Sequence, residues 1–274
     1  MFLPCLSFRS FVLFVVLFCG LVVSVINPAM ALTISPTIII IEGKSRYADV
    51  ALINTSDVVQ DYEVSWKFLS MEEGTGKYKE SGASTTPFDL TKNMVFTPKR
   101  VRLEPKSMQK VRLGLRIKGE APPPGDYRAH LELREAAVSP DQAKPASKGT
   151  SVGIKINVGF SIPVVYRVGA SDVTAEIGDV VLGVNPVTSK IEASVPIQLS
   201  ESPYGVLGHL YVYYNNKLIG EVGNANIFAE THKRTFTVPL KSDKLSGGSL
   251  KVVFMDYRKD QNRTYAQKII EVGK

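Results

Sequence analysis

Hydrophobic and polar residues alternate along most of this chain with a period of two. The longest alternating file occupies residues 151–167, with small or polar residues between its apolar side chains. The six apolar members are Val152, Ile154, Ile156, Val158, Phe160 and Ile162. Alternation of β-branched and aromatic residues predicts a strand with one apolar face. Such a strand fits the core of a β-sandwich or a sheet edge offered to another protein, and the pattern alone favours the core.

Shorter alternating stretches, separated by turn-forming residues, precede this file. They predict six strands, at residues 33–41, 46–53, 61–69, 94–103, 107–117 and 125–135. The stretch 71–93 is rich in Gly, Ser and Thr and has no period, so we expect a loop there. With the strand at 151–166, seven short strands at this spacing predict an immunoglobulin-like sandwich.

A second set of strands follows a short polar break at residues 170–172. The predicted strands are 174–183, 190–199, 208–214, 217–222, 235–239, 249–254 and 263–272. No stretch shows a helical apolar period longer than a turn or two. A length of 274 residues suits two domains. The sequence therefore predicts an all-β protein with two immunoglobulin-like β-sandwich domains, at residues 32–168 and 169–274.

An apolar block at residues 11–26 opens the chain, after the single charge Arg9 and before small residues that end at Ala31. This arrangement predicts a secretory signal peptide over residues 1–31, cleaved after Ala31. An uncleaved anchor helix is the alternative, but the block is short for a membrane span. Both cysteines, Cys5 and Cys19, fall in this segment. We therefore expect an exported protein that has no disulfide and is not inserted in the membrane after cleavage.

The charge and the missing motifs exclude several classes of function. Cleavage at Ala31 would remove Arg9 and lower the net charge from +7 to +6. Without a basic run that contains aromatic residues, this excess does not predict nucleic-acid binding. The three histidines lack metal-ligand spacing, and neither a nucleophile elbow nor a phosphate-binding glycine loop is present. We expect no catalytic residue, no metal and no cofactor, and nothing indicates an enzyme.

Several motifs occur in a characteristic order along the predicted strands. They are FTP at 96–98, VRLEP at 101–105, KVRL at 110–113, GDYRAHLELRE at 125–135, IPVVYR at 162–167 and FMDY at 254–257. In this order the chain resembles the periplasmic pilus chaperones of the chaperone–usher pathway, the PapD-like family. The resemblance covers most of residues 32–260 and implies two sandwiches in an L or boomerang arrangement.

The resemblance also assigns a role to the long alternating file. It implies that Val152, Ile154, Ile156 and Val158, with Phe160 and Ile162 at the hinge end, are lent as a strand to an unfinished pilus subunit. Strand addition of this kind occurs in chaperone–pilin complexes. The implied location is the periplasm, and the implied partners are pilus or fimbrial subunits and an outer-membrane usher.

Three charged residues fall where the family has an interdomain cluster of acids around an arginine. They are Asp126, Arg167 and Asp256. The resemblance implies that Arg167, in the hinge, pairs with both carboxylates and fixes the angle between the domains.

One departure from the family concerns the cations that hold the terminal carboxylate of a subunit. Ile38 and Pro163 occupy those positions here, and neither binds an anion. The ending of the long strand and the run around His130 instead resemble the archaic or alternative branch of the family. Since Arg128 faces away from the apolar file of its strand, it is our candidate for the carboxylate anchor.

Two other functions are compatible with the same residues. A secreted structural or adhesive protein with two immunoglobulin-like domains would keep the file of residues 152–162 in its own core. A PapD-like chaperone that acts without an usher would use the file as proposed but deliver its client differently.

Overall fold

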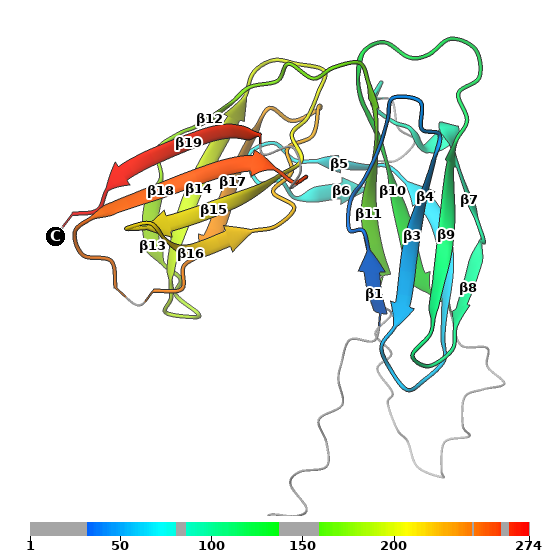
Figure 1. The fold of residues 1–274 in the computed structure, drawn as a ribbon, viewed down its shortest axis with the longest axis horizontal. Coiled ribbons are helices and arrows are strands. Elements are labelled where there is room, and N and C mark those ends of the chain that lie inside the picture. The colour runs from blue at the N-terminus through cyan, green and yellow to red at the C-terminus, as the bar shows by residue number, and fades with distance from the viewer. Residues whose placement is uncertain (1–31, 81–85, 137–158, 243, 259–262, 274) are drawn as a thin grey trace, which may run out of the picture.

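The computed structural model describes residues 32–80, 86–136, 159–242, 244–258 and 263–273, and its regular structure is almost entirely β-strand. The strands form two β-sandwiches set at an angle, which gives the molecule the shape of an L (Figure 1). This confirms the all-β class and the two immunoglobulin-like domains. The expected signal peptide lies outside the described residues, and so do Val152, Ile154, Ile156 and Val158 of the long file.

The first sandwich consists of a four-stranded and a five-stranded sheet. The four-stranded sheet contains, in spatial order, β1 (Leu32–Ser35), β3 (Tyr47–Asn54), β9 (Met108–Leu115) and β7 (Met94–Thr97). The five-stranded sheet contains β2 (Ile39–Glu42), β11 (Gly159–Val168), β10 (Gly125–Glu135), β4 (Gln60–Lys67) and β8 (Arg100–Leu103). Neighbouring strands run antiparallel except for β2, which runs parallel to β11.

The apolar files predicted from the sequence build the core between these sheets. On β10, Ala129, Leu131 and Leu133 are fully buried, and Val50 and Leu52 are fully buried on β3. Because successive side chains of a strand point to opposite faces, each file is buried as a unit. Fully burying one such Val or Leu side chain contributes roughly 1.5–3 kcal/mol.

Two stretches expected as single strands are each divided by a proline. Residues 33–41 form β1 and β2 with Pro36 between them, and residues 94–103 form β7 and β8 with Pro98 between them. In each case the two strands lie in opposite sheets. Proline has no N–H to donate to a ladder, so it ends the pairing and the chain crosses to the other sheet.

The second sandwich is organised around β14 (Ile191–Leu199). It pairs with β17 (Lys233–Pro239) on one side and with β12 (Ala175–Ile177) and β13 (Val181–Val184) on the other. The single strand expected at 174–183 is therefore two strands. The facing sheet contains β16 (Lys217–Val222), β15 (Gly208–Tyr214), β18 (Ser249–Asp256) and β19 (Thr264–Glu271), in that order. Val195, Leu210 and Phe254 are fully buried between the sheets.

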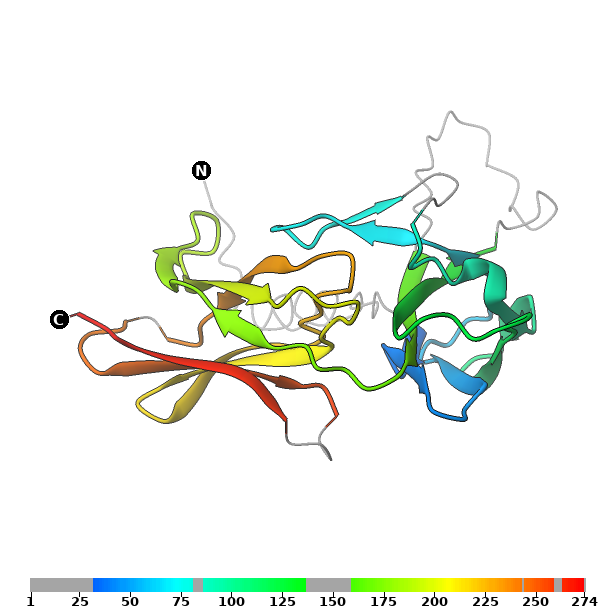
Figure 2. The ribbon, with the colours of Figure 1, turned by 90° about the horizontal axis from the view of Figure 1, so that it is seen from above.

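The stretch 71–93, expected to be a loop, contains a hairpin of β5 (Leu69–Met71) and β6 (Tyr78–Glu80), and a short 3-10 helix, η1 (Thr91–Asn93). The hairpin leaves the first sandwich and lies along the second (Figure 2).

The tip of this hairpin is joined to β17 through backbone hydrogen bonds. The N–H of Gly74 donates to the carbonyl of Lys233 at 2.8 Å, and the N–H of Thr235 donates to the carbonyl of Gly74 at 2.8 Å. Gly74 has a φ of 79°, which glycine adopts at little cost. The hairpin therefore extends from one domain to pair with the sheet of the other.

Candidate functional site

Strand β11 is paired unequally on its two sides. It pairs with β10 along its whole length, from Gly159 opposite Arg134 to Val168 opposite Gly125. On the other side, β2 covers only the part from Val164 to Arg167. In the described part of the chain, the outer edge from Gly159 to Pro163 therefore has no partner strand. Its backbone groups are available to a further strand.

A cavity of about 430 Å³ lies beside this edge. Its apolar lining includes Leu32, Ile34, Phe160 and Ile162. Its remaining lining residues are Thr37, Tyr78, Ser161, Pro163, Asn224, Asn226 and Arg234. Ile162 also belongs to the core of the first sandwich, and Phe160 packs against that core. The cavity thus lies between the open edge of β11 and the second domain.

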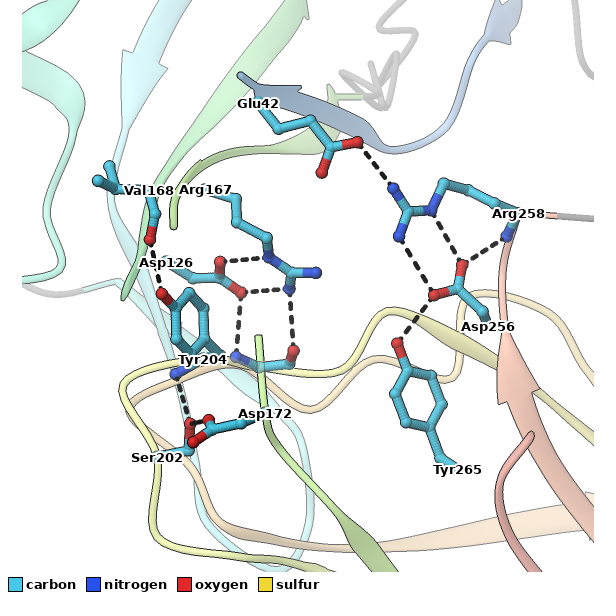
Figure 3. Close-up of polar contacts among 11 residues, drawn as sticks. Glu42, Asp126, Arg167, Val168, Asp172, Ser202, Tyr204, Asp256, Arg258 and Tyr265 are labelled. Carbon is cyan, nitrogen blue, oxygen red and sulfur yellow. Dashed lines mark hydrogen bonds and ion pairs between the residues drawn. The ribbon is translucent and has the colours of Figure 1, made fainter. Parts of the chain in front are cut away.

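A buried ion pair at the other end of β11 contacts the second domain (Figure 3). Arg167 donates two hydrogen bonds to the Asp126 carboxylate, from Nε to Oδ1 at 2.7 Å and from Nη2 to Oδ2 at 2.6 Å. Nη2 also donates to the carbonyl of Gly205 in the second domain, and the N–H of Gly205 donates to Asp126, both at 3.0 Å. Burial alone would lower the pKa of Arg167, but Asp126 raises it above its ordinary value.

Further contacts hold the loop of Gly205 in place. The hydroxyl of Tyr204 donates to the Val168 carbonyl at 2.7 Å, and the N–H of Asp126 donates to the Pro203 carbonyl at 2.9 Å. A Cβ on Gly205 would lie 2.5 Å from the Ile227 carbonyl oxygen, so glycine is required for this close approach. The ends of β10 and β11 are therefore attached to a closely packed loop of the second domain.

Asp256 does not join Arg167. Its carboxylate accepts hydrogen bonds from Arg258 Nε at 3.1 Å and from the Tyr265 hydroxyl at 2.8 Å. Arg258 in turn donates to Glu42 of β2 at 2.8 Å, so this chain of contacts also crosses between the domains (Figure 3). Of the two pairings expected for Arg167, the one with Asp126 is present, whereas Asp256 pairs with Arg258 instead.

The pKa shifts around Asp256 follow from these contacts. Burial raises the pKa of the Asp256 carboxyl, but the bonds and the charge of Arg258 lower it more, so that it falls below its ordinary value. Burial and the hydrogen bond to Asp256 raise the pKa of Tyr265 to about 12. Asp256 is therefore held as a carboxylate and Tyr265 as a neutral phenol.

Arg128, the candidate anchor, lies at the domain junction. Its side chain is 3% exposed and forms an ion pair with Glu230 of the second domain. It also donates to the Leu69 carbonyl at 2.6 Å, and its guanidinium carbon lies 3.6 Å from the ring centre of Phe228. Burial lowers the pKa of Arg128 more than Glu230 raises it. A subunit carboxylate would have to displace Glu230, and the role of Arg128 as an anchor stays a prediction.

His130, two residues further along β10, is fully buried beside Arg128. Its Nδ1 accepts a hydrogen bond from the N–H of Leu69 at 3.3 Å. Its ring packs edge-on against Tyr78 and Phe228, with ring centres 5.2 and 6.4 Å away. Burial and, to a smaller extent, the positive charge of Arg128 together lower the pKa of His130 to about 3. The imidazole is therefore neutral at ordinary pH.

The sequence did not reveal several residues of this junction. Arg258 follows a recognised motif by one position, and its charge two positions after Asp256 was the available signal. Glu230 and Gly205 lie in loops without a periodic pattern, so nothing in the sequence marked them.

Comparisons with known proteins give only structural similarities. No family model matches the chain, and no curated protein matches it. Among solved structures, the chain is similar to the E. coli chaperone DraB, with 14% identity, 88% of this chain and 96% of that chain covered, and a TM-score of 0.45.

Two further structures are similar over a comparable length. One is a chain from the complex of Salmonella enterica SafA pilin with the SafB chaperone, with 11% identity, 90% and 98% coverage and a TM-score of 0.45. The other is a chain from the CsuC–CsuE chaperone–tip adhesion subunit complex of archaic chaperone-usher Csu pili of Acinetobacter baumannii, with 11% identity, 89% and 99% coverage and a TM-score of 0.46.

No group of three or more His, Cys, Asp or Glu residues could hold a metal ion within the described ranges. No helix in the described part of the chain is long and apolar enough to cross a membrane.

The buried pair at the junction predicts a large effect of Arg167→Gln. This variant leaves the Asp126 carboxylate buried without its counter-charge, so the free energy of unfolding should fall by about 3–5 kcal/mol in urea denaturation. The matched control is Arg100→Gln, which removes an exposed pair with Glu63 and should cost less than about 1 kcal/mol. Equal losses in the two variants would contradict a structural role for the buried pair.

Because His130 is buried and neutral, we predict that the free energy of unfolding depends on pH above the range in which carboxylates titrate. In the unfolded chain His130 takes up a proton near pH 6.5, whereas in the folded chain it takes one up only near pH 3. Stability is therefore lost as the pH falls below 6.5. Between pH 7 and pH 5 the free energy of unfolding should fall by about 2 kcal/mol.

His130→Asn keeps a hydrogen-bond acceptor for Leu69 and removes the titrating group. Urea denaturation at both pH values should show a much smaller fall for this variant, while His232→Asn, on a partly exposed loop, should retain the fall. If His130→Asn loses as much stability as the wild type, His130 is not the responsible group.

Proposed function

We propose that this protein is a periplasmic chaperone that binds pilus or fimbrial subunits by donating a strand and delivers them to an outer-membrane usher. The observation that carries the proposal is the outer edge of β11 from Gly159 to Pro163, which pairs with no strand of the described residues and lies beside a partly apolar cavity. An extended segment added to such an edge gains main-chain hydrogen bonds, and adjacent pockets select its side chains.

The sequence before β11 supports the same role. Phe160 and Ile162 occupy alternate positions of β11 and contact the core of the first sandwich. Val152, Ile154, Ile156 and Val158 continue this file in the sequence. If the strand extends through them in the complex, the period of two gives their side chains the same face as Phe160 and Ile162. The file would then fill the groove that a subunit leaves open.

Burial of the file would be the largest favourable contribution to binding. Fully burying one Val or Ile contributes roughly 1.5–3 kcal/mol, so the four residues from Val152 to Val158 give on the order of 10 kcal/mol before the costs of association. A charge-assisted hydrogen bond to a carboxylate adds roughly 1.5–3 kcal/mol. Burial therefore supplies most of the affinity, and a charged contact mainly sets the register.

The domain junction supports the proposal by its position. The Arg167–Asp126 pair, through its bonds to Gly205, and the Arg258–Glu42 pair connect the second domain to the ends of β11 and β2. Residues of both domains line the cavity beside the open edge. We infer that these contacts fix the angle between the domains so that a subunit meets both.

A secreted structural or adhesive protein is the alternative, and a chaperone that acts without an usher is a variant of the first proposal. In the adhesive alternative the file of residues 152–158 would belong to the protein's own core. Acidic substitutions there would then unfold the protein, whereas in a chaperone they would abolish only the binding of the subunit.

The decisive experiment changes the donated file and keeps the rest of the chain. Ile156→Asp with Val158→Asp places two charges in the groove, so co-expression with a subunit encoded beside this gene should yield no stable complex. The control is Asn157→Asp, which adds a charge on the opposite file and should leave complex formation intact.

Circular dichroism and thermal melting of the same variants separate the alternatives. A folded double variant without a bound subunit supports strand donation. A complex that survives both Asp substitutions refutes it, and an unfolded double variant favours the alternative in which the file is a core strand.

A further inference from the structure

His130 is buried by the domain junction and not by the core of its own sandwich. On β10, Ala129 and Leu131 belong to that core, so the side chain of His130 between them points to the other face of the sheet. This face is covered by the hairpin of β5 and β6 and by the second domain, since the His130 ring contacts Tyr78 and Phe228. Release of the hairpin would therefore expose His130 while the core of the first sandwich stays intact.

The hairpin contacts the second domain at its tip and near its base (Figure 2). At the tip are the two backbone bonds of Gly74 to β17. Near the base, the Thr231 hydroxyl donates to the Met71 carbonyl at 3.2 Å, and the N–H of Met71 donates to Glu230 at 3.3 Å. The Met71 side chain packs in a small apolar cluster with Phe228. Because much of the hairpin is exposed, we expect it to open at a lower free energy than the sandwich cores.

His130 contributes a hydrogen bond to the base of this hairpin. Its Nδ1 accepts from the N–H of Leu69, the first residue of β5. The proton of the neutral ring therefore lies on Nε2, which is buried and has no hydrogen-bond partner among the described residues. An acid proton would add to Nδ1 and face the N–H of Leu69. The bond that ties β5 to β10 would then be lost.

Charged groups surround His130 on the elements packed against it. They are Arg128 and Glu132 on β10, Lys67 on β4, Glu80 on β6, Arg234 on β17 and Glu230 in the second domain. The carboxylates are bonded to cations, Glu80 and Glu132 to Lys67 and Glu230 to Arg128. Tyr78, in ring contact, is a neutral phenol in the acidic range. An imidazolium would thus be buried beside Arg128 with no described carboxylate bonded to it, which is costly.

We propose that protonation of His130 releases the hairpin of β5 and β6 from the second domain, so that the hairpin is an acid-sensitive clasp between two folded sandwiches. Buried histidines whose charging opens an interface are a common form of pH switch. The clasp is a property of the free chain and does not depend on strand donation. Its release would also remove Tyr78 from the wall of the cavity beside β11.

The two protonation equilibria determine the size of the effect. With the hairpin docked, the pKa of His130 is about 3, whereas with the hairpin released the pKa returns to its ordinary value of 6.5. Acid therefore favours the released state as the pH falls below 6.5. The ratio of released to docked hairpin should rise about 25-fold between pH 7 and pH 5.

Hydrogen exchange followed by NMR on the chain from Leu32 onward tests the clasp directly. The reporters are the N–H groups of Gly74 and Thr235, which join the hairpin to β17, and the references are amides of β3 and β9. After correction for the intrinsic exchange rate at each pH, the protection of the reporters should fall about 25-fold from pH 7 to pH 5. In low urea their exchange should change little, unlike that of the references, because a local opening exposes little surface.

Three variants separate titration from docking. His130→Asn keeps an acceptor for Leu69 and leaves every carboxylate in place, so the protection of the reporters should hardly depend on pH. His232→Asn should retain the full dependence. Met71→Ala removes apolar contacts of the hairpin, so it should lower the protection at both pH values and keep the ratio between them. Circular dichroism establishes that each variant is folded.

Several results would overturn the clasp. They are protection of Gly74 and Thr235 that does not depend on pH, a fall that persists in folded His130→Asn, reporter exchange with the urea dependence of the references, and unchanged protection in Met71→Ala. Each of these measurements is made on the free chain. The proposed function is decided separately, by the complex test with Ile156→Asp and Val158→Asp.

Discussion

We propose that the bidentate pair of Arg167 and Asp126 is the interaction on which the arrangement of the two domains depends. The two residues are cross-strand neighbours on β11 and β10, so each fixes the other before the second domain is considered. Together they accept from and donate to the backbone of Gly205. The pair would leave buried donors and acceptors unsatisfied in any arrangement of the domains that moved Gly205 away. It therefore specifies one junction between the domains.

The two halves of β11 serve different purposes. The half from Val164 to Val168 pairs with β2 as far as Arg167 and ends in the junction, whereas the outer edge from Gly159 to Pro163 has no partner strand among the described residues. Open edges invite pairing with other chains, and proteins usually cover or charge them. In the proposed function this open edge is the binding site. The junction keeps the second domain, with Arg234, next to the edge.

The strands could be predicted from the sequence wherever apolar and polar residues alternate. A strand that buries one of its two faces has apolar residues at every second position. The strand breaks at Pro36 and Pro98 were missed, since alternation continues across a proline that moves the chain to the other sheet. The hairpin of β5 and β6 was missed because backbone bonds to β17, not an apolar file, hold its tip. Arg167 was found through a motif, but Glu230 acts through a contact between the domains that no local pattern records.

Hydrogen exchange of the backbone amides, compared between the free protein and its complex with a subunit, tests the central claim most directly. Strand donation predicts that binding slows exchange most strongly between Val152 and Ser161, because a new strand would occupy the outer edge of β11. Slower exchange confined to the sheets of the second domain, with residues 152–161 unchanged, would contradict it.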